Sequence, residues 1–157
     1  MEQALSGVKV LDLTHYIAGP YCTKLLADYG AEVIKIERPG IGDGARRTGP
    51  FFSDDPHPEK SGLFLYLNTN KLGITLNLKS DTGVKIFKEL AEDTDILVET
   101  FRPGVMERLG LSYQTLEAIN PRLVMVSISN FGQNGPYRDF AATEIVADAM
   151  GGWMSII

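Results

Sequence analysis

Residues 8–37, VKVLDLTHYIAGPYCTKLLADYGAEVIKIE, decide the fold class of this chain. Residues 8–13 and 31–37 are short, apolar and rich in β-branched side chains, which is typical of strands buried on both faces. Between them Pro20 suits the first turn of a helix, and Gly30 suits its end. Apolar residues recur there at helical spacing: Cys22, Leu25, Leu26 and Tyr29. We therefore expect one strand–helix–strand unit with a right-handed parallel crossover.

The rest of the chain repeats this alternation of strand and helix patterns. Further strands are predicted at residues 74–78, 95–99 and 123–128, and helices at 81–92 after a Ser80 cap, 105–109, 113–119 and 144–153. Because the strands are almost wholly apolar, they indicate a mostly parallel sheet with helices on both faces, and we predict an α/β fold of the nucleotide-binding, Rossmann type. The apolar end, WMSII at 153–157, lacks Gly, Pro and charge. We expect residues 1–157 to be an incomplete large domain.

Residues 39–62 are different in character, because glycines and prolines are scattered among polar residues. The pattern supports no regular element there. A structureless stretch of this length is typical of a functional lid or of a segment that reaches another subunit. Arg46 and Arg47 within it could contact an anion or could form a solvated surface pair, and both alternatives stay open.

Composition excludes several classes of function. The chain has 157 residues, 44% hydrophobic residues and a net charge of -5. An acidic chain disfavours a nucleic-acid partner, since affinity for phosphate backbones comes from clustered positive charge. One cysteine cannot form an internal disulfide, and we find neither a run of roughly 20 apolar residues nor a leader pattern. We expect a cytoplasmic protein without a membrane partner.

Three loops follow predicted strands, at residues 14–20, 38–40 and 100–104, where open α/β sheets bind ligands. The first lacks the G-x-G-x-x-G spacing, which disfavours an NAD site. Arg38 ends the second strand, where an arginine can accommodate a ribose phosphate of NADP or coenzyme A, or can pair with Glu37 or Asp43 at the surface.

The other candidate residues for chemistry are single ones. His15 could act as a base, but with only two histidines no metal set assembles, and a structural role is the alternative. Cys22 falls on the predicted apolar helix face and is expected to pack in the core. Glu144 and Asp148 are four residues apart, so a helix would place them on one face, for acid–base work or simply in solvent.

Four separated segments resemble one known family when taken together. They are GVKVLDLTHYIAGPYCTKLLADYGAEVIKIERPGIGD at 7–43, NTNKLGITLNLKSDTG at 68–83, DILVETFRPGVMERLGL at 95–111 and NPRLVMVSISNFGQNGPY at 120–137. In this order they look like the amino-terminal portion of class III CoA-transferases, the CaiB/BaiF family, which includes formyl-CoA and carnitine-type transferases and α-methylacyl-CoA racemases. The resemblance covers essentially the whole chain.

The resemblance implies a CoA-transferase that carries coenzyme A on its large domain and needs no metal. It implies CoA contacts at Ile17, Ala18, Arg38, Leu76, Asn77, Leu78, Lys79, Thr100, Phe101, Arg102, Arg108, Ala141, Ala142 and Thr143. The cations among these would serve the phosphates, while Ile17 and Phe101 would suit the pantetheine arm and adenine. Glu144 matches a glutamate beside the family's active site and is given a supporting catalytic role.

The resemblance also implies a mechanism, in which an aspartate carboxylate attacks the acyl thioester and forms an anhydride and then an enzyme thioester. That aspartate lies beyond Ile157 in relatives, so the chain by itself is expected to bind CoA weakly and not to turn over. Ile17 replaces the glutamine of formate-specific relatives, which favours a larger or less polar acid. Thr143 and Glu144 replace the His-Asp pair of racemases, which favours transfer over racemisation. Relatives are interlocked homodimers.

Two alternatives from other classes remain. An NADP-binding reductase domain would fit Arg38 but not the missing glycines. A non-catalytic CoA-binding or assembly fragment would bind a partner without any acyl-CoA chemistry. The acyl donor, the acceptor and the pathway are not encoded in these residues.

Overall fold

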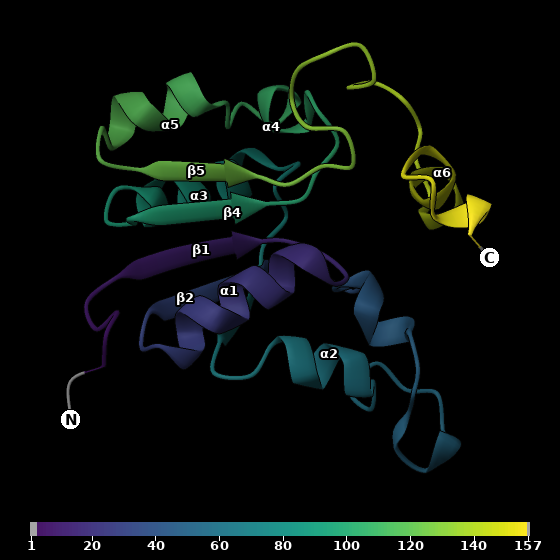
Figure 1. Ribbon diagram of the computed structural model, residues 1–157. Helices are drawn as coiled ribbons and strands as arrows, with labels where there is room; N and C mark the ends of the chain where they lie inside the picture. The colour runs from purple at the N-terminus through teal and green to yellow at the C-terminus, as the bar shows by residue number, and fades with distance from the viewer. Residues whose placement is uncertain (1–2, 157) are drawn as a thin grey trace.

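The computed structural model describes residues 3–156, and its centre is a five-stranded sheet in which every strand is parallel to its neighbours (Figure 1). The strands lie in the order β3-β2-β1-β4-β5. Their bounds are β1 Lys9–Leu13, β2 Glu32–Glu37, β3 Leu72–Thr75, β4 Ile96–Glu99 and β5 Val124–Ser127. The predicted α/β fold class is therefore confirmed.

Helices cover both faces of the sheet, as the sequence predicts. Their bounds are α1 Ala18–Asp28, α2 Gly62–Leu67, α3 Asp81–Ala91, α4 Val105–Arg108, α5 Tyr113–Ile119 and α6 Glu144–Met150, with 3₁₀ turns η1 Gly44–Arg47, η2 Phe52–Asp54 and η3 Trp153–Ser155. Among residues 3–156, no helix has the length and apolar content that a membrane span requires.

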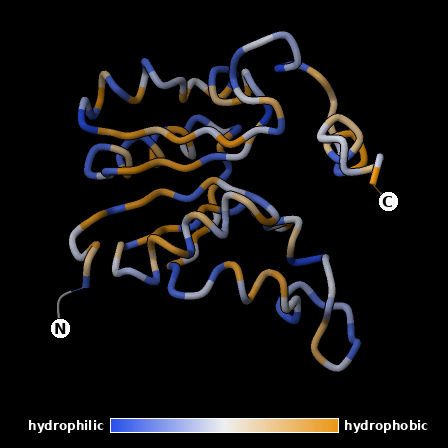
Figure 2. The backbone as a smooth tube through the Cα atoms, viewed as in Figure 1, coloured by the Kyte–Doolittle hydropathy of each residue, from blue (hydrophilic) through white to orange (hydrophobic). Residues whose placement is uncertain are grey.

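Two clusters of buried apolar side chains, one on each face of the sheet, hold the helices to it. The strands are largely hydrophobic along their length (Figure 2). Successive residues of a strand point to opposite faces, so Leu11 and Leu97 share a cluster with Phe87 of α3, Met106 of α4 and Leu116 of α5, whereas Val10 and Val98 pack with α1. The predicted cap of α3 is confirmed, because Ser80 Oγ accepts a hydrogen bond from the backbone N–H of Gly83. The core thus lies on both sides of the three central strands.

Helix α1 packs on the sheet through a face that overlaps the predicted one only at Leu26, which packs against the core. Its buried residues are Gly19, Pro20, Thr23 and Ala27, whereas Tyr29 is 61% exposed, Leu25 is 40% exposed and Cys22 is only half-buried. The reason is close approach, since a Cβ added at Gly19 would lie 2.4 Å from Thr14 Cβ. Small residues therefore face the sheet, and Cys22 is not the core residue that the spacing predicts.

The segment predicted to be irregular, residues 39–62, contains local structure. It includes η1 and η2, and α2 begins at its end and has no counterpart in the prediction. Asp43 caps η1 by accepting from the Ala45 N–H, and Ser61 caps α2 by accepting from the Phe64 N–H. These elements are only three to six residues long. They are too short to show the hydrophobic periodicity by which a helix is recognised in a sequence rich in Gly and Pro.

The edge strands are less buried than predicted. In β5 only Met125 packs against the core, while Val124 is 57% exposed and Val126 is 36% exposed. These two valines point to the sheet face that α1 covers, but α1 reaches only as far as β4. Strand β3 begins two residues and ends three residues earlier than predicted, because residues 77–80 form the turn that caps α3. Helix α6 lies to one side of the sheet (Figure 1) and ends at Met150 instead of 153.

Candidate functional site

A cavity of about 300 Å³ lies where β1, β2 and β4 end and where the chain leaves β3. Parallel strands place all their carboxyl ends on the same edge of a sheet, so residues far apart in the sequence converge there. Its lining is Leu13, His15, Ile36, Glu37, Arg38, Ile41, Gly42, Leu76, Asn77, Leu78, Lys79, Phe101, Val105 and Leu109. Six of these residues are predicted CoA contacts: Arg38, Leu76, Asn77, Leu78, Lys79 and Phe101.

The cavity has an apolar interior and a polar rim. Leu13, Ile36 and Leu76 belong to or pack against the buried core cluster, so the cavity interior is continuous with the core. The Phe101 ring centroid lies 6.0 Å from that of His15, and the two rings are tilted against each other. Arg38 and Lys79 are exposed at the rim. This arrangement fits a ligand with one flat apolar group and one anionic group.

Arg38 is free to meet such an anion. Of its two neighbouring acids, Asp43 lies against Lys35, and Glu37 is held by Arg46, whose Nε and Nη2 each donate a bond of 2.7 Å to its carboxylate. Within residues 3–156 no carboxylate forms an ion pair with Arg38 or Lys79. The surface pairing of Arg38 with Glu37 or Asp43 that the sequence left open is therefore not found.

Arg46 is a structural residue: its guanidinium is paired with carboxylates, so neither alternative that the sequence left open, an anion contact or a solvated surface pair, describes it. Besides Glu37 it donates 2.8 Å to Glu59 Oε1, and its guanidinium carbon lies 3.7 Å from the centroid of the Phe64 ring. Burial raises the pKa of Glu37, but the hydrogen bonds from Arg46 and the Asp43 N–H, together with the charges of Arg46 and Lys35, outweigh burial and lower the pKa. The negative charge of Glu37 beside the cavity is thereby neutralised. Arg47 donates to the Ile41 carbonyl.

The other predicted site residues lie outside the cavity lining. Ile17 and Ala18 are exposed where α1 begins, and Thr100 Oγ1 accepts 2.9 Å from the His15 N–H, so the loops after β1 and β4 are joined. Arg102 and Arg108 are exposed on either side of Gly104. Ala141, Ala142, Thr143 and Glu144 lead into α6, away from the cavity. Their CoA contacts stay a prediction.

A buried network of charged side chains beside the cavity was missed by the sequence reasoning. Asp12 and Lys35 are register partners on β1 and β2, and both are buried. Each is the one charged residue in the middle of an otherwise apolar strand, and this is the signal that could have found them. Because a buried charge is costly unless it is paired, a Lys and an Asp at equivalent positions of two buried strands indicate a joint polar network.

The Asp12 carboxylate accepts four hydrogen bonds. It accepts from the N–H and hydroxyl of Thr14, from Thr23 Oγ1 at 2.6 Å and from Lys71 Nζ at 2.9 Å. Burial raises the pKa of Asp12, but the charges of Lys35 and Lys71 and the hydrogen bonds from Thr14 and Thr23 together outweigh burial, and the pKa is lowered. Burial lowers the pKa of Lys71 to about 8, although Asp12 acts in the opposite direction.

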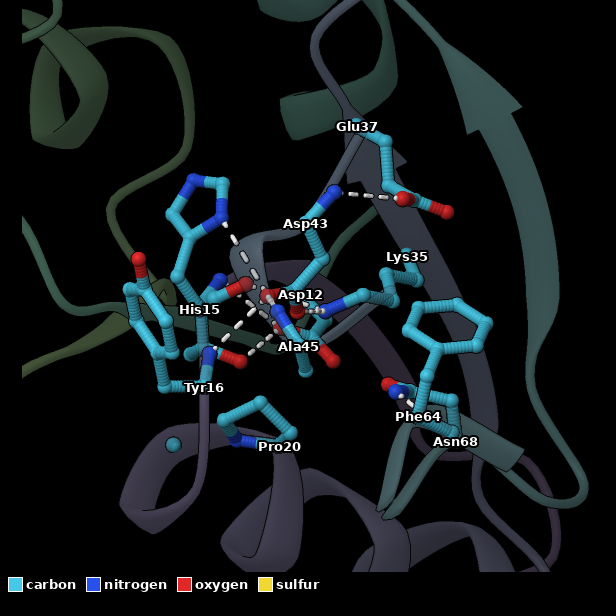
Figure 3. A network of polar contacts seen from close by, with 12 residues as sticks. Asp12, His15, Tyr16, Pro20, Lys35, Glu37, Asp43, Ala45, Phe64 and Asn68 are labelled. Carbon is cyan, nitrogen blue, oxygen red and sulfur yellow. Dashed lines mark hydrogen bonds and ion pairs between the residues drawn. The ribbon is translucent and has the colours of Figure 1, made fainter. Parts of the chain in front are cut away.

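Asp43 links this network to the loop after β1 (Figure 3), where His15 lines the cavity. Its Oδ1 accepts from the Tyr16 N–H at 3.0 Å and from the Ala45 N–H at 2.9 Å, and its Oδ2 lies 3.0 Å from Lys35 Nζ. Burial opposes ionisation, but His15, Lys35 and the backbone donors outweigh burial and hold the pKa of Asp43 far below its usual range. The carboxylate is thus a permanent anchor between the loops after β1 and β2.

Glu99 is a further buried carboxyl at this edge of the sheet, besides Glu37 and Asp43. It ends β4 and accepts 2.6 Å from the Phe101 N–H, which orients the residue that lines the cavity. Burial raises the pKa of Glu99. Its role is to hold the Phe101 backbone.

Comparison with known proteins finds a matching family profile, similar sequences and similar crystal structures. Residues 5–157 match the sequence profile of CoA-transferase family III. The chain is 46% identical over 152 residues to a formyl-CoA:oxalate CoA-transferase of Bradyrhizobium sp. (strain ORS 278), covering 97% of this chain and 35% of that protein. It is 45% identical to the succinyl-CoA:glutarate CoA-transferase of Mus musculus, covering 97% and 34%. A crystal structure of a CaiB/BaiF family protein from Brucella suis matches with a TM-score of 0.87 and 34% identity, covering 97% and 40%. The chain spans about a third of the length of these curated relatives.

Proposed function

Because the chain belongs to CoA-transferase family III, we propose that it forms the amino-terminal part of the large, CoA-binding domain of an enzyme that moves coenzyme A from an acyl-CoA to a carboxylic acid. One observation carries this proposal beyond the family assignment. The cavity combines an apolar interior with two rim cations, Arg38 and Lys79, that form no ion pair in the described part of the chain. CoA joins a flat adenine to several phosphates and needs both features.

Different residues of this chain would bind different parts of the CoA molecule. Arg38 and Lys79 would donate to phosphate oxygens at the rim, since charge-assisted hydrogen bonds are the strong ones. Leu76, Leu78 and Phe101 would bury apolar parts of the ligand. The remaining contacts that the family resemblance implies would lie along the path of the pantetheine arm and its phosphates: Ile17, Ala18, Asn77, Thr100, Arg102, Arg108, Ala141, Ala142 and Thr143.

The transfer would proceed through covalent intermediates on an aspartate supplied from outside residues 1–157. Its carboxylate attacks the thioester carbonyl, the CoA thiolate leaves and a mixed anhydride forms. The thiolate then attacks the aspartyl carbonyl, which releases the donor acid and leaves an enzyme thioester. The acceptor carboxylate repeats the two steps in reverse. Splitting one transfer in this way replaces a difficult step by easier ones.

The substrate end of the site is proposed only in outline. Ile17 offers no polar contact to a small acyl group, which favours an acid larger or less polar than formate or oxalate. Glu144 would support the reaction as a polar neighbour, and a second subunit interlocked with the first would complete the enzyme.

Ligand binding and transfer test the proposal directly in the full-length protein. CoA, NADPH and buffer are compared in a thermal-shift assay, and CoA transfer is followed from succinyl-, acetyl- and formyl-CoA to oxalate, glutarate and longer acids. Stabilisation by CoA with transfer to at least one acid is expected. Stabilisation by NADPH and not by CoA would select a reductase, and CoA binding without any transfer would select a binding module.

A further inference from the structure

The loop after β1 is held in an unfavourable backbone conformation. Tyr16 has a φ of 64°, in the left-handed region that costs free energy for any residue with a Cβ. Its side chain is 59% exposed, so burial of the ring does not compensate for this cost. Some other interaction must therefore hold the backbone of Tyr16, and the structure contains one.

Asp43 provides that interaction from the loop after β2. The Tyr16 N–H donates to Asp43 Oδ1 at 3.0 Å, and the Asp43 N–H donates to Glu37 Oε2 at 2.8 Å, so Asp43 is fixed in turn to the last residue of β2. The Tyr16 ring occupies the space beside Gly44, where an added Cβ would lie 2.3 Å from Tyr16 Cζ. The loops after β1 and β2 are thus joined by the hydrogen bond from the Tyr16 N–H to Asp43 and by the packing of the Tyr16 ring against Gly44.

Lys35 and Thr100 fix the residues that precede Tyr16. Lys35 Nζ lies 3.0 Å from both Asp43 Oδ2 and the carbonyl oxygen of Thr14, and Thr100 Oγ1 accepts from the His15 N–H. Three successive residues of the loop are therefore held by side chains from other elements. The His15 ring, which lines the cavity beside Phe101, projects from the middle of this held segment.

We propose that Asp43 is a positioning residue for the CoA site, which holds the backbone of Tyr16 so that His15 closes one side of the cavity. Asp43 does not line the cavity. It acts through the loop backbone and through the His15 ring, whose Nδ1 lies 3.8 Å from Asp43 Oδ1. The inference rests on the proposed function, because CoA is the ligand whose binding the loop position affects.

Two matched variants of the full-length protein separate positioning from charge. Lys35→Met with Asp43→Asn and Lys35→Met with Asp43→Ala both remove the buried ion pair, but only asparagine keeps an acceptor oxygen for the Tyr16 N–H. We expect the alanine double variant to bind CoA about tenfold more weakly than the asparagine one, since an unsatisfied buried donor has that order of cost. The KM for the acyl-CoA should rise with it, while kcat differs less than about twofold because the loop contributes to binding and not to the reacting atoms.

A readout that needs no ligand keeps the two proposals distinguishable. Amide hydrogen exchange at Tyr16 should be faster in the alanine variant than in the asparagine variant, and Asp93→Ala, which removes an exposed carboxylate, should change neither exchange nor affinity. Equal CoA affinity of the two double variants, despite different exchange, would overturn the positioning role. A wild-type protein that binds no CoA would instead overturn the proposed function. Should the double variants not fold, the single variants Asp43→Asn and Asp43→Ala are compared by the same criterion.

Discussion

Lys71 Nζ lies 2.9 Å from Asp12 Oδ2, and the two side chains are only 1% and 0% exposed. The same ammonium donates to the Pro20 carbonyl and to Asn68 Oδ1, each at 2.9 Å. This pair therefore ties β1 to the first turn of α1 and to the end of α2. It is the most deeply buried contact between these elements that carries charge.

The pKa of Lys71 makes the stability of this pair depend on pH. The pKa is lowered from 10.5 to about 8, chiefly by burial. Between these values the unfolded chain holds a proton that the folded chain has released, so the free energy of unfolding rises with pH. Lys71→Met should lower it by about 3 kcal/mol near pH 8, because Asp12 loses a buried partner. The deficit should widen toward about pH 10, since the variant lacks the wild-type rise.

Urea unfolding at the two pH values measures this deficit. The control is Lys85→Met, which removes an ammonium whose side chain is 79% exposed and should give the same small change at both pH values. A Lys71→Met deficit that stays constant or narrows as pH rises would contradict the lowered pKa.

The rim cations should recognise phosphate. Arg38→Ala and Lys79→Ala are each expected to weaken CoA binding about tenfold, the order of one charge-assisted hydrogen bond. Titration calorimetry with CoA and with 3′-dephospho-CoA assigns the phosphate, since a residue that contacts the 3′-phosphate discriminates between the two ligands. Lys85→Ala removes the same charge from α3, outside this cavity, and serves as the control. Unchanged affinity in both rim variants would exclude these cations from the site.

Gly19 should tolerate no side chain. A Cβ there would lie 2.4 Å from Thr14 Cβ and 2.6 Å from Thr100 Cγ2, in the two loops that border the cavity. Gly19→Ala should therefore destabilise the fold by about 1–3 kcal/mol through overpacking. Gly73→Ala, at a position with open space around it, should change stability by less than about 0.5 kcal/mol. Similar midpoints for both variants in thermal unfolding would show that α1 can move away from the sheet.

Arg46 should not be replaceable by lysine. Lysine keeps the charge but loses the two-point contact with Glu37 and the planar stacking on Phe64. We expect Arg46→Lys to lower the free energy of unfolding by about 1–2 kcal/mol. Arg47→Lys, which affects a single exposed hydrogen bond to the Ile41 carbonyl, should cost less. Chemical denaturation compares the two, and an equal loss would mean that the fork geometry of Arg46 contributes nothing.

The strand pattern predicted the sheet well, because buried parallel strands are apolar throughout and their ends are marked by polar residues. The helix faces were harder to predict. Hydrophobic spacing favoured Leu25 and Tyr29 in α1, but close packing selects for small size, so Gly19 and Thr23 face the sheet. Short turns such as η1 form around single capping side chains, here Asp43, and leave no periodic signal.

The candidate site could be predicted only in part, because the signal from a single charged residue in an apolar strand is weak. Arg38 was singled out because it ends the second strand, where an arginine can accommodate a ribose phosphate. Lys35 and Asp12 were read as parts of apolar strands, since one charged residue does not change the overall pattern. Their role becomes clear only because they are paired across β1 and β2. That pairing depends on the strand register, which the sequence alone does not supply.

The network of Asp12, Lys35, Asp43 and Lys71 contains two carboxylates and two ammonium groups in a buried space. Loss of any one of them leaves a net charge where water cannot screen it. Substitutions at these four positions should therefore be inherited together. In homologous proteins, the residues at these four positions should covary so that the numbers of carboxylates and ammonium groups stay equal. Sequences with a single replacement among the four should be rare.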